Sequence, residues 1–260
     1  MLMKSGLSVT FLGTGTSQGI PIIGSTHPVC LSDNPKDKRL RVSVLLQWET
    51  YTYVIDCGPD FRQQMLRANC DRLDGILLTH EHSDHTAGID DIRPFYFRQG
   101  NIPFYAYQRV FDALHQRFEY IFEIENKYPG APTIEEVVID KDTSFVIGGK
   151  KVQPVEGLHN TLPVLGFKID GFTYLTDIKT MEEAEILKIK NTEVLVINAL
   201  RETPHESHFN LAEALDFINQ IQPKRAYLTH ISHLLGFHAE VEKNLPDHVR
   251  LAYDGLQLTL

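Results

Sequence analysis

Short apolar segments rich in β-branched and aromatic residues recur along this chain in two groups, and each group has helical segments of its own. In the first group, strands are expected at residues 9–12, 42–46, 51–55 and 75–79, and helices at 61–68 and 110–121. In the second group, strands are expected at 136–139, 151–155, 165–169, 172–175, 194–197, 225–229, 250–253 and 256–260, and helices at 181–189 and 211–221. Residues 13–40 predict an irregular loop, and residues 126–133, with two prolines and a glycine, predict a loop at the tip of an insertion. Two such groups predict an α/β protein built as a layered sandwich.

The size and charge of the chain limit its function. With 260 residues, of which 42% are hydrophobic, the chain can form one large α/β domain or two small ones. We expect a single domain over residues 1–260. The formal net charge of −9 disfavours binding along a nucleic acid, which needs a stripe of lysine and arginine, and a small anionic substrate held by metal ions remains compatible with it.

The cysteines and the N-terminal sequence bear on the compartment. Cys30, Cys57 and Cys70 are odd in number and widely spaced, which argues against a disulfide framework and for a reducing environment. Residues 1–6 lack the apolar core of a signal peptide, and no run approaches 18 apolar residues. We therefore expect a cytoplasmic protein without a membrane span.

Residues 80–85 carry the strongest chemical signal in the chain. The segment directly follows the apolar run 75–79 and reads His80, Glu81, His82, Ser83, Asp84, His85. If His80 and His82 continue the strand, their side chains share one face and can bind one ion. A turn would then direct Asp84 and His85 at a second ion, as in two-metal hydrolases. The competing interpretation, a histidine-rich surface loop, does not explain this spacing after a buried strand.

Three more polar side chains stand at or near the ends of expected strands: His159, Asp177 and His230. Singly, each has a modest claim, because an aspartate after a strand often serves a turn and a lone histidine is often packed or solvated. Together with residues 80–85 they supply the seven ligands that a two-metal site needs. Asp177 is a candidate to bridge both ions.

These residues resemble the metallo-β-lactamase superfamily of binuclear hydrolases, and the resemblance covers nearly the whole chain. The opening segment 11–16 and the Asp56-Cys57-Gly58 sequence are similar to early motifs of that superfamily. The resemblance implies a four-layer αββα sandwich and two divalent ions, zinc or manganese. The metal ligands it implies are His80, His82, Asp84, His85, His159, Asp177 and His230.

Within the superfamily the chain resembles PhnP-type phosphodiesterases, which open ribosyl 1,2-cyclic phosphates. The loop 201–210 matches the place where that family carries a catalytic histidine, which here is His208, with His205 as the competitor in the same loop. Asn210 and Glu213 have the spacing of a capping box, which would hold His208 just before a helix. In the implied mechanism a protonated His208 stabilises developing charge and protonates the leaving group, while Asp84 orients the attacking water.

The PhnP-type family also has a separate structural zinc site, to which His27, Cys30 and His233 correspond here. A tetrahedral structural zinc takes four ligands. This sequence has Ser25 where the family pattern has a cysteine, so the site lacks one expected ligand.

The expected function is therefore hydrolysis of a small anionic phosphodiester, with nucleic acid as an improbable partner and a homodimer implied by the resemblance alone. The alternatives are an endonuclease similar to RNase Z, a thioester or lactone hydrolase of the same superfamily, and a metal-binding scaffold without catalysis. The net charge and the lack of a basic, glycine-rich arm argue against the nuclease.

Overall fold

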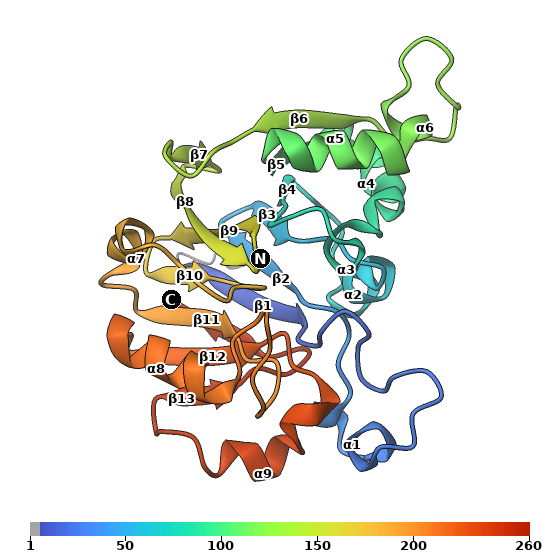
Figure 1. Ribbon diagram of the computed structural model, residues 1–260. Coiled ribbons are helices and arrows are strands. Elements are labelled where there is room, and N and C mark those ends of the chain that lie inside the picture. Colours follow the sequence, from blue (N-terminus) through green and yellow to red (C-terminus); the bar gives the residue numbers. More distant parts are fainter. Residues whose placement is uncertain (1–5) are drawn as a thin grey trace. The chain divides into compact units, whose positions relative to one another are not determined.

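The computed structural model describes residues 6–260, which divide into two compact units (Figure 1). Unit 1 runs to Leu12 and includes residues 43–140 and 257–259; unit 2 comprises residues 13–42, 141–256 and Leu260. Residues 1–5, which belong to the segment expected to lack a signal peptide, lie outside the described residues. Among residues 6–260, no helix has the length and apolar character needed to cross a bilayer.

Unit 1 contains a seven-stranded mixed sheet in the order β14-β1-β2-β3-β4-β5-β6. Its strands are β1 (Ser8–Gly13), β2 (Ser43–Trp48), β3 (Tyr51–Ile55), β4 (Gly75–Leu77), β5 (Ile102–Ala106), β6 (Ile134–Val138) and β14 (Gln257–Thr259). Strands β2 and β3 form an antiparallel hairpin, whereas β3, β4, β5 and β6 are parallel neighbours. The carboxyl ends of these parallel strands therefore lie at one edge of the sheet.

Helices supply much of the apolar core of unit 1. They are α2 (Phe61–Arg67), α3 (Ser83–Thr86), α4 (Arg93–Gln99), α5 (Gln108–Arg117), α6 (Glu119–Phe122) and the 3₁₀ turn η2 (Ile89–Ile92). Phe61 of α2 and Val110, Phe111 and Leu114 of α5 are fully buried in one cluster with strand residues such as Ile76. The spacing of these α5 residues places them on one helix face, which explains why this helix packs on the sheet.

The helix expected at residues 110–121 is interrupted. Phe118 has φ −127° and ψ 40°, which is not helical, so α5 ends at Arg117 and α6 is a separate turn. Both sides still contribute to the core, through Leu114 and Ile121, so the apolar spacing predicted the burial but not the break. The expected loop at 126–133 follows α6 and extends away from it (Figure 1).

Unit 2 contains a second seven-stranded mixed sheet in the order β13-β12-β11-β10-β9-β8-β7. Its strands are β7 (Phe145–Ile147), β8 (Lys150–His159), β9 (Leu162–Ile169), β10 (Phe172–Tyr174), β11 (Val194–Asn198), β12 (Arg225–Thr229) and β13 (Val249–Leu251). Strands β7 to β10 are antiparallel neighbours, and β10 to β13 are parallel.

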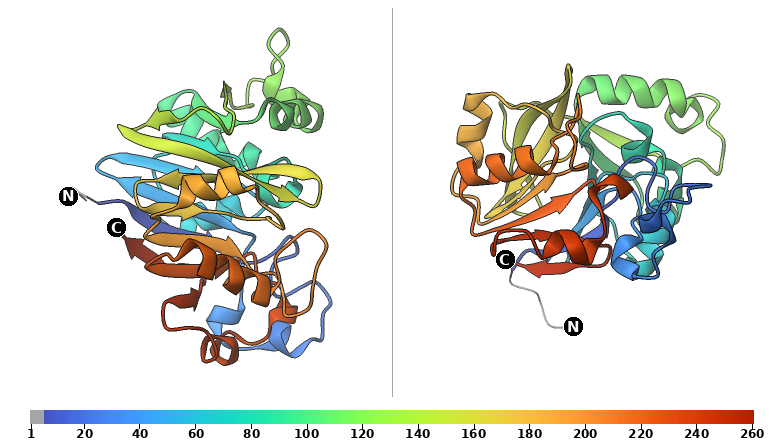
Figure 2. Two further views of the ribbon diagram at one scale, coloured as in Figure 1. Left: turned by 60° about the vertical axis from the view of Figure 1, so that its left-hand side comes forward. Right: turned by 60° about the horizontal axis from the view of Figure 1, so that its bottom comes forward.

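Helices α7 and α8 cover a face of the unit 2 sheet, in front of its strands in the left view of Figure 2. The helices of this unit are α1 (Pro28–Leu31), α7 (Glu183–Ile189), α8 (Leu211–Ile221), α9 (His238–Glu242), and the 3₁₀ turns η1 (Pro35–Asp37) and η3 (His233–Leu235). Ile186 and Ile189 of α7 and Phe217 of α8 pack in one cluster with the buried side chains of β11 and β12. Each unit is thus a mixed sheet whose helices complete its core.

Candidate metal centre

The histidine-rich segment of unit 1 lies just beyond a strand rather than in it. Strand β4 ends at Leu77, and His82 is the N-cap residue of α3. The strand alternation expected for His80 and His82 is therefore wrong, because the backbone leaves the sheet before His80. The turn expected for Asp84 and His85 is present as α3.

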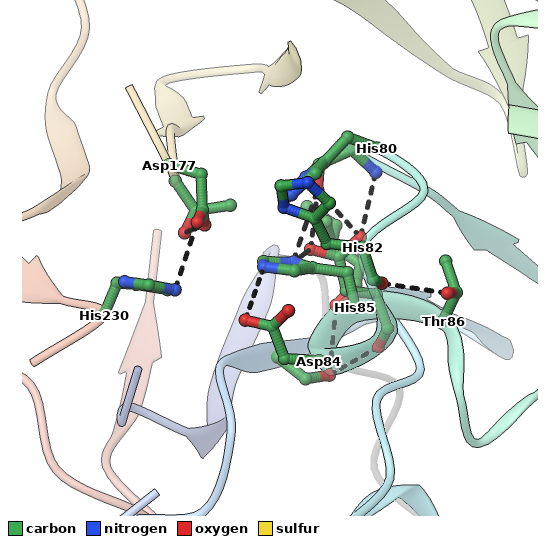
Figure 3. Close-up of polar contacts among 12 residues, drawn as sticks. His80, His82, Asp84, His85, Thr86, Asp177 and His230 are labelled. Carbon is green, nitrogen blue, oxygen red and sulfur yellow. Dashed lines mark hydrogen bonds and ion pairs between the residues drawn. The ribbon is translucent and has the colours of Figure 1, made fainter. Parts of the chain in front are cut away.

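The segment nevertheless gathers its imidazoles, as Figure 3 shows. The ring centroid of His80 lies 4.6 Å from that of His82 and 4.2 Å from that of His85. Asp84 Oδ2 lies 3.3 Å from His85 Nε2. His80 and His85 are fully buried. Four ligand-type side chains thus converge from six consecutive residues.

A buried carboxylate fixes the orientation of His85. Asp56 follows β3 with φ +63°, a left-handed conformation that is costly for a non-glycine residue. Its carboxylate accepts hydrogen bonds from the Thr79 amide at 2.9 Å and from His85 Nδ1 at 2.7 Å. Because Nδ1 of His85 donates this bond, Nε2 carries the lone pair that a metal ion needs. Burial raises the pKa of Asp56, and the neighbouring His85 and Thr79 act in the opposite direction.

The same carboxylate orients His80 through a hydroxyl group. Thr79 Oγ1 donates its proton to Asp56, at 2.9 Å from Oδ2. It can then accept the proton of His80 Nδ1, which lies at 3.0 Å. This arrangement also directs the lone pair of His80 to Nε2. Asp56 and Thr79 therefore act as supports of two candidate ligands, a role that the sequence analysis did not assign to them.

The loop is held from outside by two arginines of α5. Arg109 Nη1 lies 2.5 Å from Glu81 Oε2 and 2.6 Å from Oε1. Arg117 donates from Nη2 to the Glu81 carbonyl oxygen and from Nη1 to Ser83 Oγ, the latter at 3.5 Å. Glu81 itself points to these partners, so it anchors the segment while its neighbours carry the ligand-type side chains.

Unit 2 places Asp177 and His230 beside each other, after strands β10 and β12, which flank β11 in the parallel part of the sheet. His230 directly follows β12, and Asp177 comes three residues after β10; both have left-handed φ, +54° and +56°. His230 Nε2 lies 3.2 Å from Asp177 Oδ1, as drawn in Figure 3. Thr176 Oγ1 donates to the other oxygen, Oδ2, at 2.7 Å. The exposed fractions of Asp177 and His230 are 2% and 1%.

Asn198 fixes the loop that carries Asp177. This fully buried residue ends β11. Its Oδ1 accepts from the Ile178 amide at 2.8 Å, and its Nδ2 donates to the Ile178 carbonyl at 3.0 Å. The paired bonds stabilise the strained backbone next to Asp177. A polar residue at the end of an apolar strand was a usable signal for Asn198, but the sequence analysis missed it.

His159 and His208 complete the histidine group of unit 2. His159 is the last residue of β8, which is longer than the strand expected at 151–155. Its Nδ1 donates to the Ser207 carbonyl at 2.9 Å, which leaves the Nε2 lone pair for a metal ion. One ligand-type atom from each of His159, Asp177 and His208 lies within 4.8 Å of the other two. The geometry therefore permits His208 to act as a ligand as well as in the catalytic role expected for it.

His208 lies just before the N-terminus of α8, as the capping-box spacing of Asn210 and Glu213 predicts. Asn210 caps α8, and the reciprocal bonds with Glu213 are both present. The His208 ring centroid lies 4.7 Å from that of His230 and 5.1 Å from that of His205. Burial, with the nearby His230 and His159, lowers the pKa of His208 to about 3, while Asp177 acts in the opposite direction. The protein alone thus favours a neutral His208, not the protonated form expected from sequence.

Two of the residues expected to bind a structural zinc, His27 and His233, lie close together, but His27 caps a helix with one of its ring nitrogens. The rings of His27 and His233 lie 4.8 Å apart, and Cys30 is buried. His27 Nδ1 caps α1 by accepting from the Val29 amide at 3.3 Å, and Ser25 Oγ accepts from the His27 amide. Among residues 6–260, His27, Cys30 and His233 do not form a group whose ligand atoms all lie within 4.8 Å of one another.

The donor chemistry in each unit fits divalent metal ions. Unit 1 offers His80 and His85 with Nδ1 engaged, and unit 2 offers His159 in the same state next to the Asp177 carboxylate. Neutral imidazole nitrogen and carboxylate oxygen are the ligands that zinc and manganese prefer.

Comparisons with known proteins establish the family. A family model described as a β-lactamase superfamily domain matches residues 51–231. A crystal structure described as a new diphosphatase from the PhnP family has a TM-score of 0.91 and 34% sequence identity, with 98% of each chain covered. The chain belongs to the metallo-β-lactamase superfamily and within it is PhnP-like. The resemblance inferred from the motifs and the expected αββα sandwich are thereby confirmed.

Two further relatives match to different extents. An octanoyltransferase from Porphyromonas gingivalis is 40% identical over 248 residues, which are 95% of this chain and 50% of that protein. The chain thus spans half the length of this relative. A ribonuclease Z from Bradyrhizobium diazoefficiens is 38% identical over 84 residues, 32% of this chain and 23% of that protein. Family and fold together support a hydrolase that uses divalent metal ions.

Proposed function

We propose that the chain hydrolyses a small phosphodiester with two divalent ions, zinc or manganese. The residues that would hold the ions are His80, His82, Asp84 and His85 of unit 1 and His159, Asp177 and His230 of unit 2. The observation that carries the proposal is the tautomer of three of these histidines. A hydrogen bond holds Nδ1 in each of His80, His85 and His159, and this places the lone pair that can bind a metal ion on Nε2.

The chain's own residues have separate roles in this reaction. When bound, two such ions would lower the pKa of the attacking water and offset the charge of the phosphate. Asp84 accepts a hydrogen bond from the attacking water and so orients it. His208 donates a hydrogen bond from its ring to the oxygen on which charge develops. The buried position of His208, 8% exposed, strengthens that bond because little water competes for it.

We propose a cyclic phosphodiester of a sugar, such as a ribosyl 1,2-cyclic phosphate, as the substrate class. The PhnP likeness supports this choice. The net charge of −9 supports a small substrate over a long polyanion.

A second candidate is hydrolysis of a diphosphate. The PhnP-family protein with a TM-score of 0.91 is described as a diphosphatase. Both reactions need an activated water and a neutralised phosphoryl group, which bound ions would supply, so the proposed ligands serve either one.

The test is a substrate panel with the protein reconstituted with zinc or manganese. The panel contains bis(p-nitrophenyl) phosphate, ribose 1,2-cyclic phosphate, a nucleotide sugar with a diphosphate linkage, a precursor transfer RNA and an octanoyl thioester. His82→Ala removes one proposed ligand. His115→Ala is the matched control, because its side chain is 49% exposed and pairs with Glu136 outside the proposed site.

The expected result is turnover of the cyclic phosphate by the wild type and by His115→Ala, and its loss in His82→Ala. Preference for the diphosphate linkage would favour the second candidate. Turnover of only the thioester or only the transfer RNA would contradict both.

The structural zinc is a separate proposal. His27, Cys30 and His233 would hold it in place of the present cap on α1, with Ser25 as a weak or absent fourth ligand. A zinc ion lost in His233→Ala, with turnover kept, supports it. Equal zinc content in both proteins contradicts it.

A further inference from the structure

Helices α2 and α4 of unit 1 border a depression of about 340 Å³ that has no role in the proposed function. Its apolar floor is formed by Met65 and Phe95, which are 5% and 4% exposed. Leu66 also lines it and is 62% exposed although it is apolar. The other lining residues are Arg62, Asn69, Cys70, Asp91, Pro94 and Arg98. An apolar surface with a few polar groups at this volume is typical of a small-molecule site.

The depression is a groove between two segments that run in the same direction. One segment lines it from Arg62 to Asn69 and the other from Asp91 to Arg98, each at positions i, i+3, i+4 and i+7. Burial raises the pKa of Asp91, and Arg62 acts in the opposite direction. Burial also raises the pKa of Cys70, and there Arg98 acts in the opposite direction. Like ends therefore lie together, and the helical rise gives the groove a length of about 10 Å.

The two ends of this α2–α4 groove differ in charge. At one end, Arg62 and Asp91 offset each other. At the other end, Arg98 Nη2 donates to the Asp71 carbonyl at 3.0 Å, and the guanidinium carbon lies 5.2 Å from the Phe95 ring centroid. Among residues 6–260, no carboxylate forms an ion pair with Arg98. One positive charge is therefore available next to the apolar floor.

We propose that the α2–α4 groove binds an unbranched fatty acid, with its carboxylate on Arg98 and its alkyl chain over Met65 and Phe95. An extended alkyl chain advances roughly 1.3 Å per bond, so a chain of about eight carbons matches the groove. A single available cation suits a monoanion better than a phosphate monoester, which carries a charge of about −2. None of the lining residues is a proposed metal ligand, and the proposal does not rest on the proposed function.

The first test varies the length of the ligand. Calorimetry with the metal-loaded protein compares hexanoate, octanoate, decanoate and dodecanoate. We expect the affinity to rise about 4-fold with each methylene that the groove buries, and to level off beyond about eight carbons. The absence of saturable octanoate binding would overturn the proposal, and so would an affinity that rises undiminished to dodecanoate.

The second test separates the charge from the alkyl chain. Arg98→Gln should bind octanoate about 10-fold more weakly than the wild type and octanol equally well, because only the carboxylate contacts the guanidinium group. Octanoate held by metal ions instead would not respond to this substitution. Equal octanoate affinity of Arg98→Gln and the wild type therefore overturns the proposal, and so does an equal loss for octanol.

A charge introduced into the groove tests the position of the alkyl chain. Leu66→Glu should weaken the binding of both octanoate and octanol by about 10-fold or more. Leu187→Glu, the same change at an exposed leucine of α7 in unit 2, is the matched control and should weaken neither. Thermal denaturation verifies that the variants are folded. Unchanged binding by Leu66→Glu, or the same loss in Leu187→Glu, would contradict the proposal.

Cys70 reports directly whether the groove is occupied. It lines the groove, whereas Cys30 and Cys57 are buried. Burial raises the pKa of the Cys70 thiol to about 11, so its alkylation by iodoacetamide is slow enough to time by mass spectrometry. Octanoate at about ten times its dissociation constant should slow this alkylation by about 10-fold in the wild type, and much less in Leu66→Glu. An equal rate with and without octanoate would overturn the proposal.

Discussion

At the residue scale, three imidazoles of the proposed centre have one feature in common. In each, Nδ1 makes a hydrogen bond with a partner in its own unit. The partner is a carboxylate for His85, a hydroxyl for His80 and a backbone carbonyl for His159. Such partners fix the ring orientation and the tautomer, and they raise the basicity of the other ring nitrogen, Nε2. The site is therefore organised before any ion binds.

Asp56→Asn tests the hydrogen bond that orients His85. An amide can donate a proton to His85 Nδ1 and so permit the wrong tautomer, and we expect metal affinity to fall by about 10- to 100-fold. The measurement is a competition titration with a metal-binding dye. Asp112→Asn, an exposed residue of α5, is the control and should keep the wild-type affinity. Equal affinity of Asp56→Asn and the wild type would show that the carboxylate is not a support.

Sequence spacing predicted the ligands of unit 1 but not their supports. His80 to His85 lie within six residues, so local chemistry identifies them. The bond between Asp56 and His85 joins residues 29 apart, and only the parallel pairing of β3 with β4 brings them together. Spacing also gave the wrong local backbone for His80 and His82, because it carries no signal for where the strand ends.

A second residue-scale prediction concerns pH. Burial and the adjacent Arg39 lower the pKa of His238 to about 4, and Arg39 Nη2 lies 3.1 Å from its Nδ1. The unfolded chain, with a histidine pKa of about 6.5, binds this proton more readily. This group therefore contributes stability above pH 6.5 and loses it as the pH falls toward 4. Urea unfolding at several pH values should show a shallower loss in His238→Gln; parallel curves would contradict the assignment.

At the scale of elements, the N-terminus of α8 determines where His208 lies. Asn210 Oδ1 accepts from the Glu213 amide at 2.9 Å, and Glu213 Oε2 accepts from the Asn210 amide at 2.9 Å. We expect Asn210→Ala to lower the free energy of unfolding by about 1 kcal/mol and to reduce turnover as well. Asn219→Ala, on the exposed face of the same helix, should do neither. Urea unfolding and the hydrolysis assay check both variants. If Asn210→Ala keeps the wild-type stability and turnover, the cap neither stabilises α8 nor positions His208.

The elements that sequence predicted best have strong local signals. Strands β3 and β12 and helix α8 match their expected bounds, since turn residues or a capping box mark their ends. Strand β5, with Pro103 inside it, was not predicted, because proline lowers the strand signal although its neighbours on both sides pair with it. The break at Phe118 was missed because apolar spacing continues across it.

At the scale of the whole molecule, each unit has its own sheet, core and candidate metal ligands. Binding to the folded state alone stabilises a protein by about 2.7 kcal/mol at a free ion concentration about 100 times the dissociation constant. Removing metal with a chelator should therefore lower the melting temperature. Trp48, the single tryptophan of the chain, is buried in unit 1 and reports that unit by fluorescence.

A substitution of one proposed ligand makes this test specific. His230→Ala should reduce the change in melting temperature that the chelator causes. A chelator effect of the same size in His230→Ala and the wild type would contradict the role of His230 as a metal ligand.

The most direct measurement of the central claim is the metal content of the purified chain by mass spectrometry. The wild type is compared with His85→Ala, altered in unit 1, and His230→Ala, altered in unit 2. The account predicts that each variant holds at least one ion fewer per chain than the wild type. If both variants keep the wild-type content, these residues are not metal ligands, and the proposed binuclear centre is wrong.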